Sequence, residues 1–231
     1  NALTGEVRNI GFLSTNVNGS DYTGGLASTF ATGTIANTFV TGNIGGHNFT
    51  GGLVGNMTSG TVSNAYTSGT INGYAYSNAG GLVGYMTGGT ITGSGSGSNV
   101  TVSSNSGGLV GKNNGGTIND SFATGNVTAT AGTGFVNAAG GLVGVNAGTS
   151  SINNSRASGT VVGGGFSNGG LVGENDANAT ISGSYYNGPS VTGYLNTGGL
   201  VGQNYGNISN SYVASGASVH GATETGGFVG Y

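Results

Sequence analysis

The sequence is poor in charge and lacks two residue types altogether. Its 231 residues include no cysteine, no tryptophan and one proline, and charged side chains make up only 4%. An ordinary soluble domain is about a quarter Asp, Glu, Lys and Arg. The three cations, Arg8, Lys112 and Arg156, form no cluster that could neutralise a phosphate backbone. A nucleic-acid partner is therefore excluded.

Long hydrophobic runs are also missing. None approaches the roughly 20 residues that a membrane span needs, which argues against membrane insertion. The sequence begins at Asn1 with no signal-peptide segment before it, so we expect a mature or excised piece of a longer chain. The lack of cysteine identifies no compartment by itself. Together with the abundant uncharged Thr, Asn and Ser, it favours an extracellular or cell-surface bacterial protein.

What the sequence does contain is glycine, 54 residues of it, and hydrophobic residues at 35%. Low charge with abundant Gly, Asn, Ser and Thr is also typical of disordered tails. Here, however, the hydrophobic residues recur in a fixed register, which disorder does not require. The motif Gly-Gly-Leu-Val-Gly or a near copy occurs eight times. Its third residue is Leu26, Leu53, Leu82, Leu109, Leu142, Leu171, Leu200 or Phe228.

The spacing between these positions is 27, 29, 27, 33, 29, 29 and 28 residues. The long step matches an insertion between Thr130 and Asn137, which a stacked repeat can accept as a surface loop. A second column of β-branched residues follows each motif by eight to ten residues. It consists of Ile35, Val62, Ile91, Ile118, Ile152, Ile181 and Ile208, and Val7 of the opening segment joins it. A third column includes Val17, Ile44, Ile71, Val127, Val161, Val191 and Val219.

Two further columns accompany the second one. Two residues after the β-branched position lies Asn9, Asn37, Asn64, Asp120, Asn154 or Asn210. Two residues later again lies Phe39, Tyr66, Phe122, Tyr185 or Tyr212, with Gly11, Gly95 and Arg156 in the gaps. Strand alternation places both columns on the side of the β-branched residues, inside the protein. The Asn side chains would then form a buried ladder of stacked amides. Outward rings would instead form a sugar-binding platform.

Three short strands in about 28 residues, with no helical period, predict one turn of a β-helix per repeat. We expect an all-β, right-handed parallel β-solenoid of about eight coils over residues 1–231, with three short strands per coil. Successive coils would stack about 4.8 Å apart. Strict alternation would expose the residue after each motif Leu, such as Val54 or Val83. The flanking glycines favour a bend that buries both side chains.

These residues resemble the GLUG repeat, named for its Gly-Leu-apolar-Gly core. The resemblance extends over essentially the whole chain and implies a β-helical stalk or adhesive shaft, like those of filamentous-haemagglutinin-type bacterial surface proteins. It brings no catalytic residues. Metallopeptidases that carry such repeats would need a His-Glu-x-x-His helix, whereas His47 and His220 are isolated here.

Residues for other chemistry are scarce. Glu174 and Asp176 are the one close acidic pair, and no further acid or base lies in register with them. Polysaccharide-degrading β-helices need carboxylates paired across coils, so we expect no catalytic, cofactor or metal site. A Thr column could order water as ice-binding proteins do, or simply be a solvated strand face. It consists of Thr34, Thr61, Thr90, Thr117, Ser151, Thr180 and Asn207.

The sequence therefore predicts a non-catalytic structural or adhesive segment of an extracellular bacterial surface protein or filament. An ice- or glycan-binding solenoid is the alternative, followed by a polysaccharide-degrading enzyme. The expected partners are further repeats of the parent chain or a second copy, bound head-to-tail or laterally, and glycans of the host or environment. Neither end of the sequence contains a recognisable cap, which favours stacking or continuation at the terminal coils.

Overall fold

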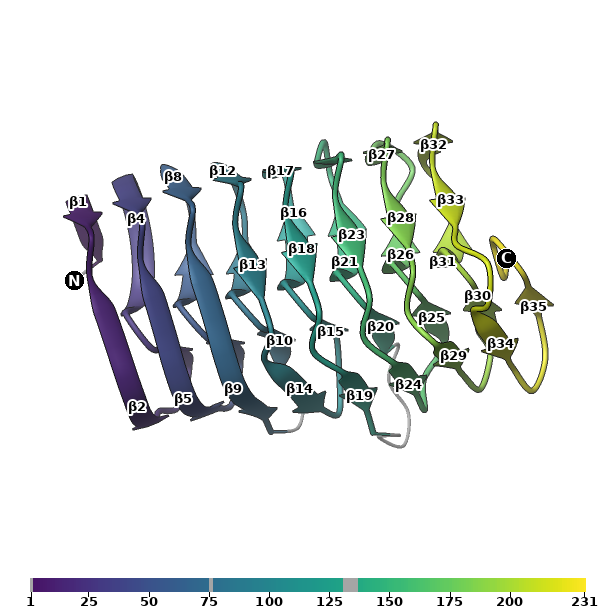
Figure 1. The fold of residues 1–231 in the computed structure, drawn as a ribbon, viewed down its shortest axis with the longest axis horizontal. Coiled ribbons are helices and arrows are strands. Elements are labelled where there is room, and N and C mark those ends of the chain that lie inside the picture. The colour runs from purple at the N-terminus through teal and green to yellow at the C-terminus, as the bar shows by residue number, and fades with distance from the viewer. Residues whose placement is uncertain (1, 75–76, 131–136) are drawn as a thin grey trace.

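A computed structural model describes residues 2–74, 77–130 and 137–231, and all regular elements in these ranges are β-strands. The chain winds into about eight coils that lie side by side from the N-terminus to the C-terminus (Figure 1). Every strand pair is parallel, and each strand pairs with its counterpart in the neighbouring coil. The parallel β-solenoid is thus confirmed, and its right-handed sense stays a prediction.

Three parallel sheets run along the solenoid, and we call them sheets A, B and C. Sheet C, which precedes the Leu column, contains β3 (Tyr22–Gly24), β6 (Phe49–Gly51), β10 (Asn78–Gly80), β15 (Ser106–Gly107), β20 (Ala138–Gly140), β25 (Ser167–Gly169), β30 (Asn196–Gly198) and β35 (Thr225–Gly226).

Sheet A follows the Leu column and contains β1 (Leu3–Arg8), β4 (Ala27–Ala36), β7 (Val54–Met57), β8 (Thr61–Ser63), β11 (Val83–Met86), β12 (Thr90–Thr92), β16 (Val110–Asn114), β17 (Thr117–Asn119), β21 (Val143–Ala147), β22 (Ser151–Asn153), β26 (Val172–Asn175), β27 (Thr180–Ser182), β31 (Val201–Asn204) and β32 (Asn207–Ser209).

Sheet B carries the aromatic and third columns. It contains β2 (Gly11–Asn18), β5 (Phe39–Gly46), β9 (Tyr66–Gly73), β13 (Gly95–Ser96), β14 (Asn99–Val102), β18 (Phe122–Ala123), β19 (Val127–Ala129), β23 (Arg156–Ala157), β24 (Val161–Gly163), β28 (Tyr185–Tyr186), β29 (Ser190–Thr192), β33 (Tyr212–Val213) and β34 (Ser218–His220). The three sheets agree with the predicted three-stranded coil, and in most coils the strands of sheets A and B are each divided into two short segments.

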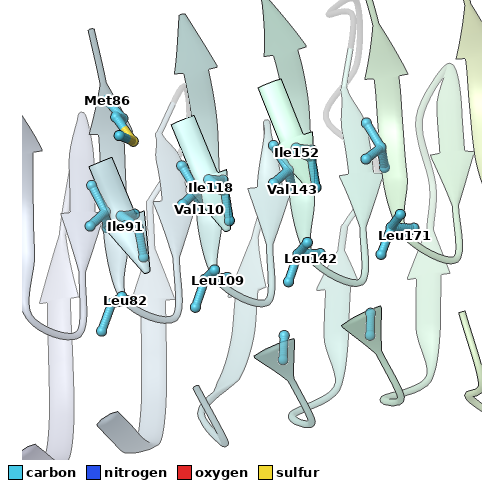
Figure 2. Packing of buried hydrophobic residues seen from close by; sticks show 14 of the residues in the cluster. Leu82, Met86, Ile91, Leu109, Val110, Ile118, Leu142, Val143, Ile152 and Leu171 are labelled. Carbon is cyan, nitrogen blue, oxygen red and sulfur yellow. The ribbon is translucent and has the colours of Figure 1, made fainter. Parts of the chain in front are cut away.

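The repeat motifs form the core between these sheets. Figure 2 shows Leu82, Leu109, Leu142 and Leu171 in one row, beside Ile91, Ile118 and Ile152. The Leu and β-branched columns are fully or almost fully buried from coil to coil. At the ends burial is lower, since Leu26 and Ile208 are half-buried and Phe228 is exposed. A continuous apolar core of this kind supplies the main favourable term for folding.

The residue after the motif Leu is also buried in the inner coils, as the flanking glycines predicted, and it is half-buried at Ala27 and Val229 in the terminal coils. Val54, Val83 and Val110 have no exposed surface. The N–H groups of Leu53 and Val54 both donate to the carbonyl of Leu82, at 2.9 and 3.1 Å, so the strand bends between them. A Cβ on Gly51 would lie 2.0 Å from the carbonyl oxygen of Val54, which shows why this bend needs glycine.

The Asn column is exposed at a corner, and its predicted inward placement is wrong. Its members have left-handed backbone, for example φ 50° at Asn37 and 48° at Asn154. This conformation turns the chain out of the strand and shifts the alternation by one residue. Gly93 and Gly183 occupy the same corner with φ 55° and 58°. The left-handed corner members are Asn9, Asn37, Asn64, Gly93, Asp120, Asn154, Gly183 and Asn210.

Asn and Asp are the non-glycine residues that best tolerate left-handed backbone, so the column serves the turn. A short amide ladder does form on the surface: Asn64 Nδ2 donates to Asn37 Oδ1 at 3.3 Å, and Asn37 Nδ2 donates to Asn9 Oδ1 at 3.1 Å. The residue after the corner enters the core instead. Ser121, for instance, is buried, donates to the carbonyl of Asn119 and accepts from the N–H of Ser94.

Candidate binding surface

The aromatic column lies on the outer face of sheet B. Phe39, Tyr66 and Tyr212 are 42%, 39% and 52% exposed, and Phe122 and Tyr185 are half-buried. The predicted inward packing is therefore wrong. Its cause is the corner residue, because left-handed backbone at Asn37 or Asn64 reverses the side on which the following aromatic residue emerges. We call the outward column of Phe39, Tyr66, Phe122, Arg156, Tyr185 and Tyr212 the aromatic stripe.

The register of the stripe is as the sequence predicted. Strand pairing aligns Gly11 with Phe39, Phe39 with Tyr66, and Tyr66 with Gly95. Farther along, Phe122 pairs with both Gly95 and Arg156. Arg156 pairs with Tyr185, which pairs with Tyr212. With six coil steps of about 4.8 Å each, the stripe is about 29 Å long.

The two glycines that pair in register with members of the stripe, Gly11 and Gly95, are covered by rings from neighbouring coils. A Cβ on Gly11 would lie 2.1 Å from Phe39 Cζ, and one on Gly95 would lie 2.4 Å from Phe122 Cζ. The two rings therefore rest on glycine backbone that has no side chain of its own. Above Gly95, Tyr66 and Phe122 approach from opposite sides, with ring centroids 6.3 Å apart. The apolar surface is thus continuous across this gap.

The C-terminal half of the stripe combines rings with a cation. Tyr185 and Tyr212 stack at 4.8 Å with an interplanar angle of 5°. The Arg156 guanidinium carbon lies 4.9 Å from the centroid of Phe122, a cation–π geometry that favours an arginine on an exposed ring. Arg8 pairs with Glu6, and this is the one ion pair formed among the described residues. Arg156 therefore contacts an aromatic ring and no carboxylate.

A polar column flanks the stripe, two residues farther along the chain in each coil, either within the sheet B strand or directly after it. It presents hydroxyl and amide groups to the solvent and contains no charge. Its polar members are Thr41, Ser68, Thr124, Ser158 and Asn187. The surface thus alternates an apolar ridge with neutral hydrogen-bonding groups.

The Thr column lies on the outer face of sheet A, in the predicted register from Thr34 to Asn207. A second polar column runs beside it, two residues farther along. Their side chains hydrogen-bond between coils. Ser151 Oγ donates to Thr117 Oγ1 at 3.3 Å, and Asn153 Nδ2 donates to Asn119 Oδ1 at 3.0 Å. Such bonds use groups that an ice-binding face would need to offer to water.

A second aromatic cluster lies over the N-terminal coils and was not predicted. Tyr22 stacks on Phe49 at 5.2 Å, and Phe49 stacks on Tyr85 at 4.9 Å, although Tyr85 belongs to sheet A and the others to sheet C. His47 stacks on Tyr74 at 4.6 Å. No aromatic column marks these residues, because the strand positions of Phe49 and Tyr85 hold Asn78 and Asn56 in neighbouring coils, and His47 and Tyr74 lie outside the strands.

The acidic pair of Glu174 and Asp176 lies on β26 and in the turn that follows it. Burial raises the pKa of the Glu174 carboxyl, the neighbouring Asp176 raises it further, and Lys112 opposes this rise. In residues 2–74, 77–130 and 137–231, no group of three or more His, Cys, Asp or Glu side chains could hold a metal ion. The described part of the chain also has no helix long and apolar enough to cross a membrane.

A buried amide ladder that was not predicted from the sequence occupies the last inward position of the sheet A strands after the Leu column. Asn113 Nδ2 donates to Asn146 Oδ1 at 3.1 Å, Asn146 to Asn175 at 2.9 Å, and Asn175 to Asn204 at 2.8 Å. We call Asn113, Asn146, Asn175 and Asn204 the inner Asn column. Each amide thus forms a hydrogen bond with the next, and a buried polar group needs such a partner.

Comparison with known proteins confirms the motif. The GLUG motif matches residues 136–162, which include the motif Leu142 and the β-branched Ile152. No curated protein matches the chain. The predicted insertion between Thr130 and Asn137 falls largely outside the described residues, since 131–136 are not described.

Proposed function

We propose that this GLUG-motif β-solenoid is a non-catalytic structural and adhesive segment of an extracellular bacterial surface protein or filament. The observation that carries the proposal is the exposed aromatic stripe, whose members pair in register from coil to coil. The parallel ladders between neighbouring coils hold one member of the stripe beside the next. Exposed apolar surface of this length marks an interaction site rather than an ordinary solvated face.

The terminal coils support continuation or self-association. Strands β32, β33, β34 and β35 each have a single neighbouring strand in the described chain. Unpaired strand edges bind further strands readily, so further repeats of the parent chain or a second copy would pair there. A head-to-tail contact between copies would generate a filament, because the contact does not close on itself.

Among the alternatives, glycan binding is favoured over ice binding. The rings point outward, as a sugar platform requires, whereas polar groups of the Thr face are partly used in bonds with one another. A polysaccharide-degrading activity would have to use Glu174 and Asp176, which lie together in one coil without a partner carboxylate in a neighbouring coil. Such an arrangement lacks the opposed acids of glycoside hydrolysis.

The test is to display the chain on a non-adherent bacterium through a carrier protein. We expect displaying cells to attach to polysaccharide-coated and host-cell surfaces more than cells with the carrier alone. We expect the purified chain to release no reducing sugar and to show no thermal hysteresis. Attachment no higher than that of the carrier would contradict the adhesive function. If the wild-type chain released reducing sugar and the Glu174→Gln variant did not, the protein would be an enzyme.

A further inference from the structure

Arg156 is the cation of the aromatic stripe. It is exposed, it lies over Phe122, and it pairs in register with Tyr185 on its other side. The ring contact restrains a side chain that would otherwise sample many rotamers, so less entropy is lost when the guanidinium binds an anion. A planar guanidinium offers two parallel N–H donors that match a carboxylate or a sulfate group.

The residues around Arg156 also fit the uncharged parts of a sugar. On one side the stacked Tyr185 and Tyr212 offer apolar ring surface and phenolic hydroxyls. Beside them, Ser158 and Asn187 add neutral hydrogen-bonding groups. A pyranose has this same combination of an apolar C–H face and a hydroxyl-bearing edge. In an extended polysaccharide, moreover, the length of one sugar unit is close to the spacing of successive coils.

We infer that the aromatic stripe binds an extended acidic polysaccharide along the solenoid axis, with a carboxylate or sulfate group of one sugar on Arg156 and neighbouring sugars on Tyr185 and Tyr212. The inference rests on the proposed adhesive function and names its ligand class. Charge complementarity selects an acidic over a neutral glycan. The stripe offers a single position in each coil, which selects a linear chain over a branched one.

One carboxylate opposes this binding. Asp120 lies at the corner of the coil that contains Phe122, two residues before the ring, and it is exposed. Five other coils have Asn at this corner, so Asp120→Asn preserves the turn while removing a negative charge near the proposed site. The variant therefore separates electrostatics from structure.

The experiment measures binding of purified protein to three probes by isothermal titration calorimetry. Polygalacturonate carries carboxylates, its methyl ester is the same backbone without charge, and dextran sulfate carries sulfate groups. For whichever acidic probe the wild type binds, we expect Arg156→Gln to raise the dissociation constant at least about tenfold. The affinity for the methyl ester should not change. Asp120→Asn should strengthen acidic binding, and Tyr212→Ala should weaken binding of all bound probes.

Lys112→Gln is the matched control, because it removes a cation from the outer face of sheet A, away from the stripe. Equal losses for Lys112→Gln and Arg156→Gln would overturn the inference in favour of unspecific charge attraction. A concentration-dependent dimer that disappears in Tyr212→Ala would also overturn it, since the stripe would then bind a second copy. If displayed cells attach normally with Arg156→Gln, the adhesive function stands and the acidic-ligand inference fails.

Discussion

In the N-terminal coils the last inward position of the sheet A strands is apolar, whereas in the C-terminal coils it is an amide. Strand pairing puts Phe30, Met57 and Met86 in one row that continues directly into the inner Asn column. Met57 and Asn146 are both fully buried. The same backbone position thus accepts a thioether or a carboxamide.

The neighbouring residues differ accordingly. Next to Met86, Gly116 has no side chain, and a Cβ there would lie 2.7 Å from the Met86 sulfur. In the amide half, Asn113 Oδ1 accepts the N–H of Gly116 at 2.9 Å, and Ser150 Oγ donates to Asn146 Oδ1 at 2.7 Å. Apolar packing stabilises one half, and a hydrogen-bonded chain stabilises the other. Within each half, the residues of this row therefore match their neighbours in the next coil, and the two halves meet where Met86 pairs with Asn113.

The largest effect is expected from placing an amide inside the apolar row. Met57→Asn would bury a carboxamide between Phe30 and Met86, with no amide neighbour and with the methionine packing lost. We expect a loss of about 4 kcal/mol of unfolding free energy. Met86→Asn should cost about half as much, because its Nδ2 could donate to Asn113 Oδ1 and extend the inner Asn column.

Urea denaturation followed by circular dichroism measures both variants. The matched control is Met86→Leu, which keeps the position apolar and should cost less than about 1.5 kcal/mol. Equal destabilisation by Met57→Asn and Met86→Asn would show that neighbouring amides contribute nothing, and the comparison of the two halves would fail.

The second effect is the reverse change, made within the inner Asn column. Asn146→Ala would leave Asn113 Nδ2, Ser150 Oγ and Asn175 Oδ1 without the Asn146 partner. At about 1–3 kcal/mol for each unsatisfied buried group, partly relieved by relaxation, we expect a loss of about 3 kcal/mol. The same denaturation assay applies. Asn178→Ala, at an exposed turn, is the control and should change stability by less than about 0.5 kcal/mol.

The third effect concerns the corner, which is the same in both halves. Asn64→Ala and Asn154→Ala remove the short amide that lets these residues adopt left-handed backbone, and each should cost about 1–2 kcal/mol. Asn154→Gly should be close to neutral, since Gly93 and Gly183 already occupy this corner. Thermal denaturation of the four proteins, wild type included, compares them. A large cost of Asn154→Gly would mean that the amide itself, rather than the turn, holds the corner.

The sequence predicted the fold because the motif columns are periodic and apolar. The Leu and β-branched columns, the parallel register and the burial of the residue after Leu all followed from spacing and glycine. The outward direction of the side chains in the aromatic stripe did not follow from the spacing, because the alternation rule assumes an unbroken strand. A signal was nevertheless present: Gly93 and Gly183 exchange with Asn at the corner, and positions where Asn, Asp and Gly exchange favour left-handed backbone.

The inner Asn column could also have been found from the sequence. Asn113, Asn146, Asn175 and Asn204 each follow the motif Leu by four residues, at the offset where Phe30, Met57 and Met86 lie in other coils. A polar residue that replaces buried apolar residues at one offset is expected to be buried as well. The aromatic cluster around Phe49 could not be found in this way, because it depends on how Tyr85 of sheet A approaches the rings of sheet C.

The smallest effect is a pH dependence confined to the C-terminal half. There the outward position before the inner Asn column is Lys112, Val145 and Glu174, whereas the N-terminal coils have the neutral Asn56 and Tyr85. Because burial and Asp176 raise the pKa of Glu174 in the folded state, the folded protein binds this proton more tightly than the unfolded chain. The stability that this tighter proton binding gives the folded protein is therefore complete below the ordinary pKa of 4.5 and is lost as the pH rises through the raised pKa.

Glu174→Gln removes this loss of stability, so the variant should be more stable than the wild type at pH 7 by less than about 1 kcal/mol, since the side chain is partly solvated. At a pH below the ordinary value the variant and the wild type should be equally stable by urea denaturation. Glu224→Gln, on the exposed last coil, is the control, and a gain from Glu174→Gln that persists in acid would show that the glutamate is unfavourable for a reason other than its charge.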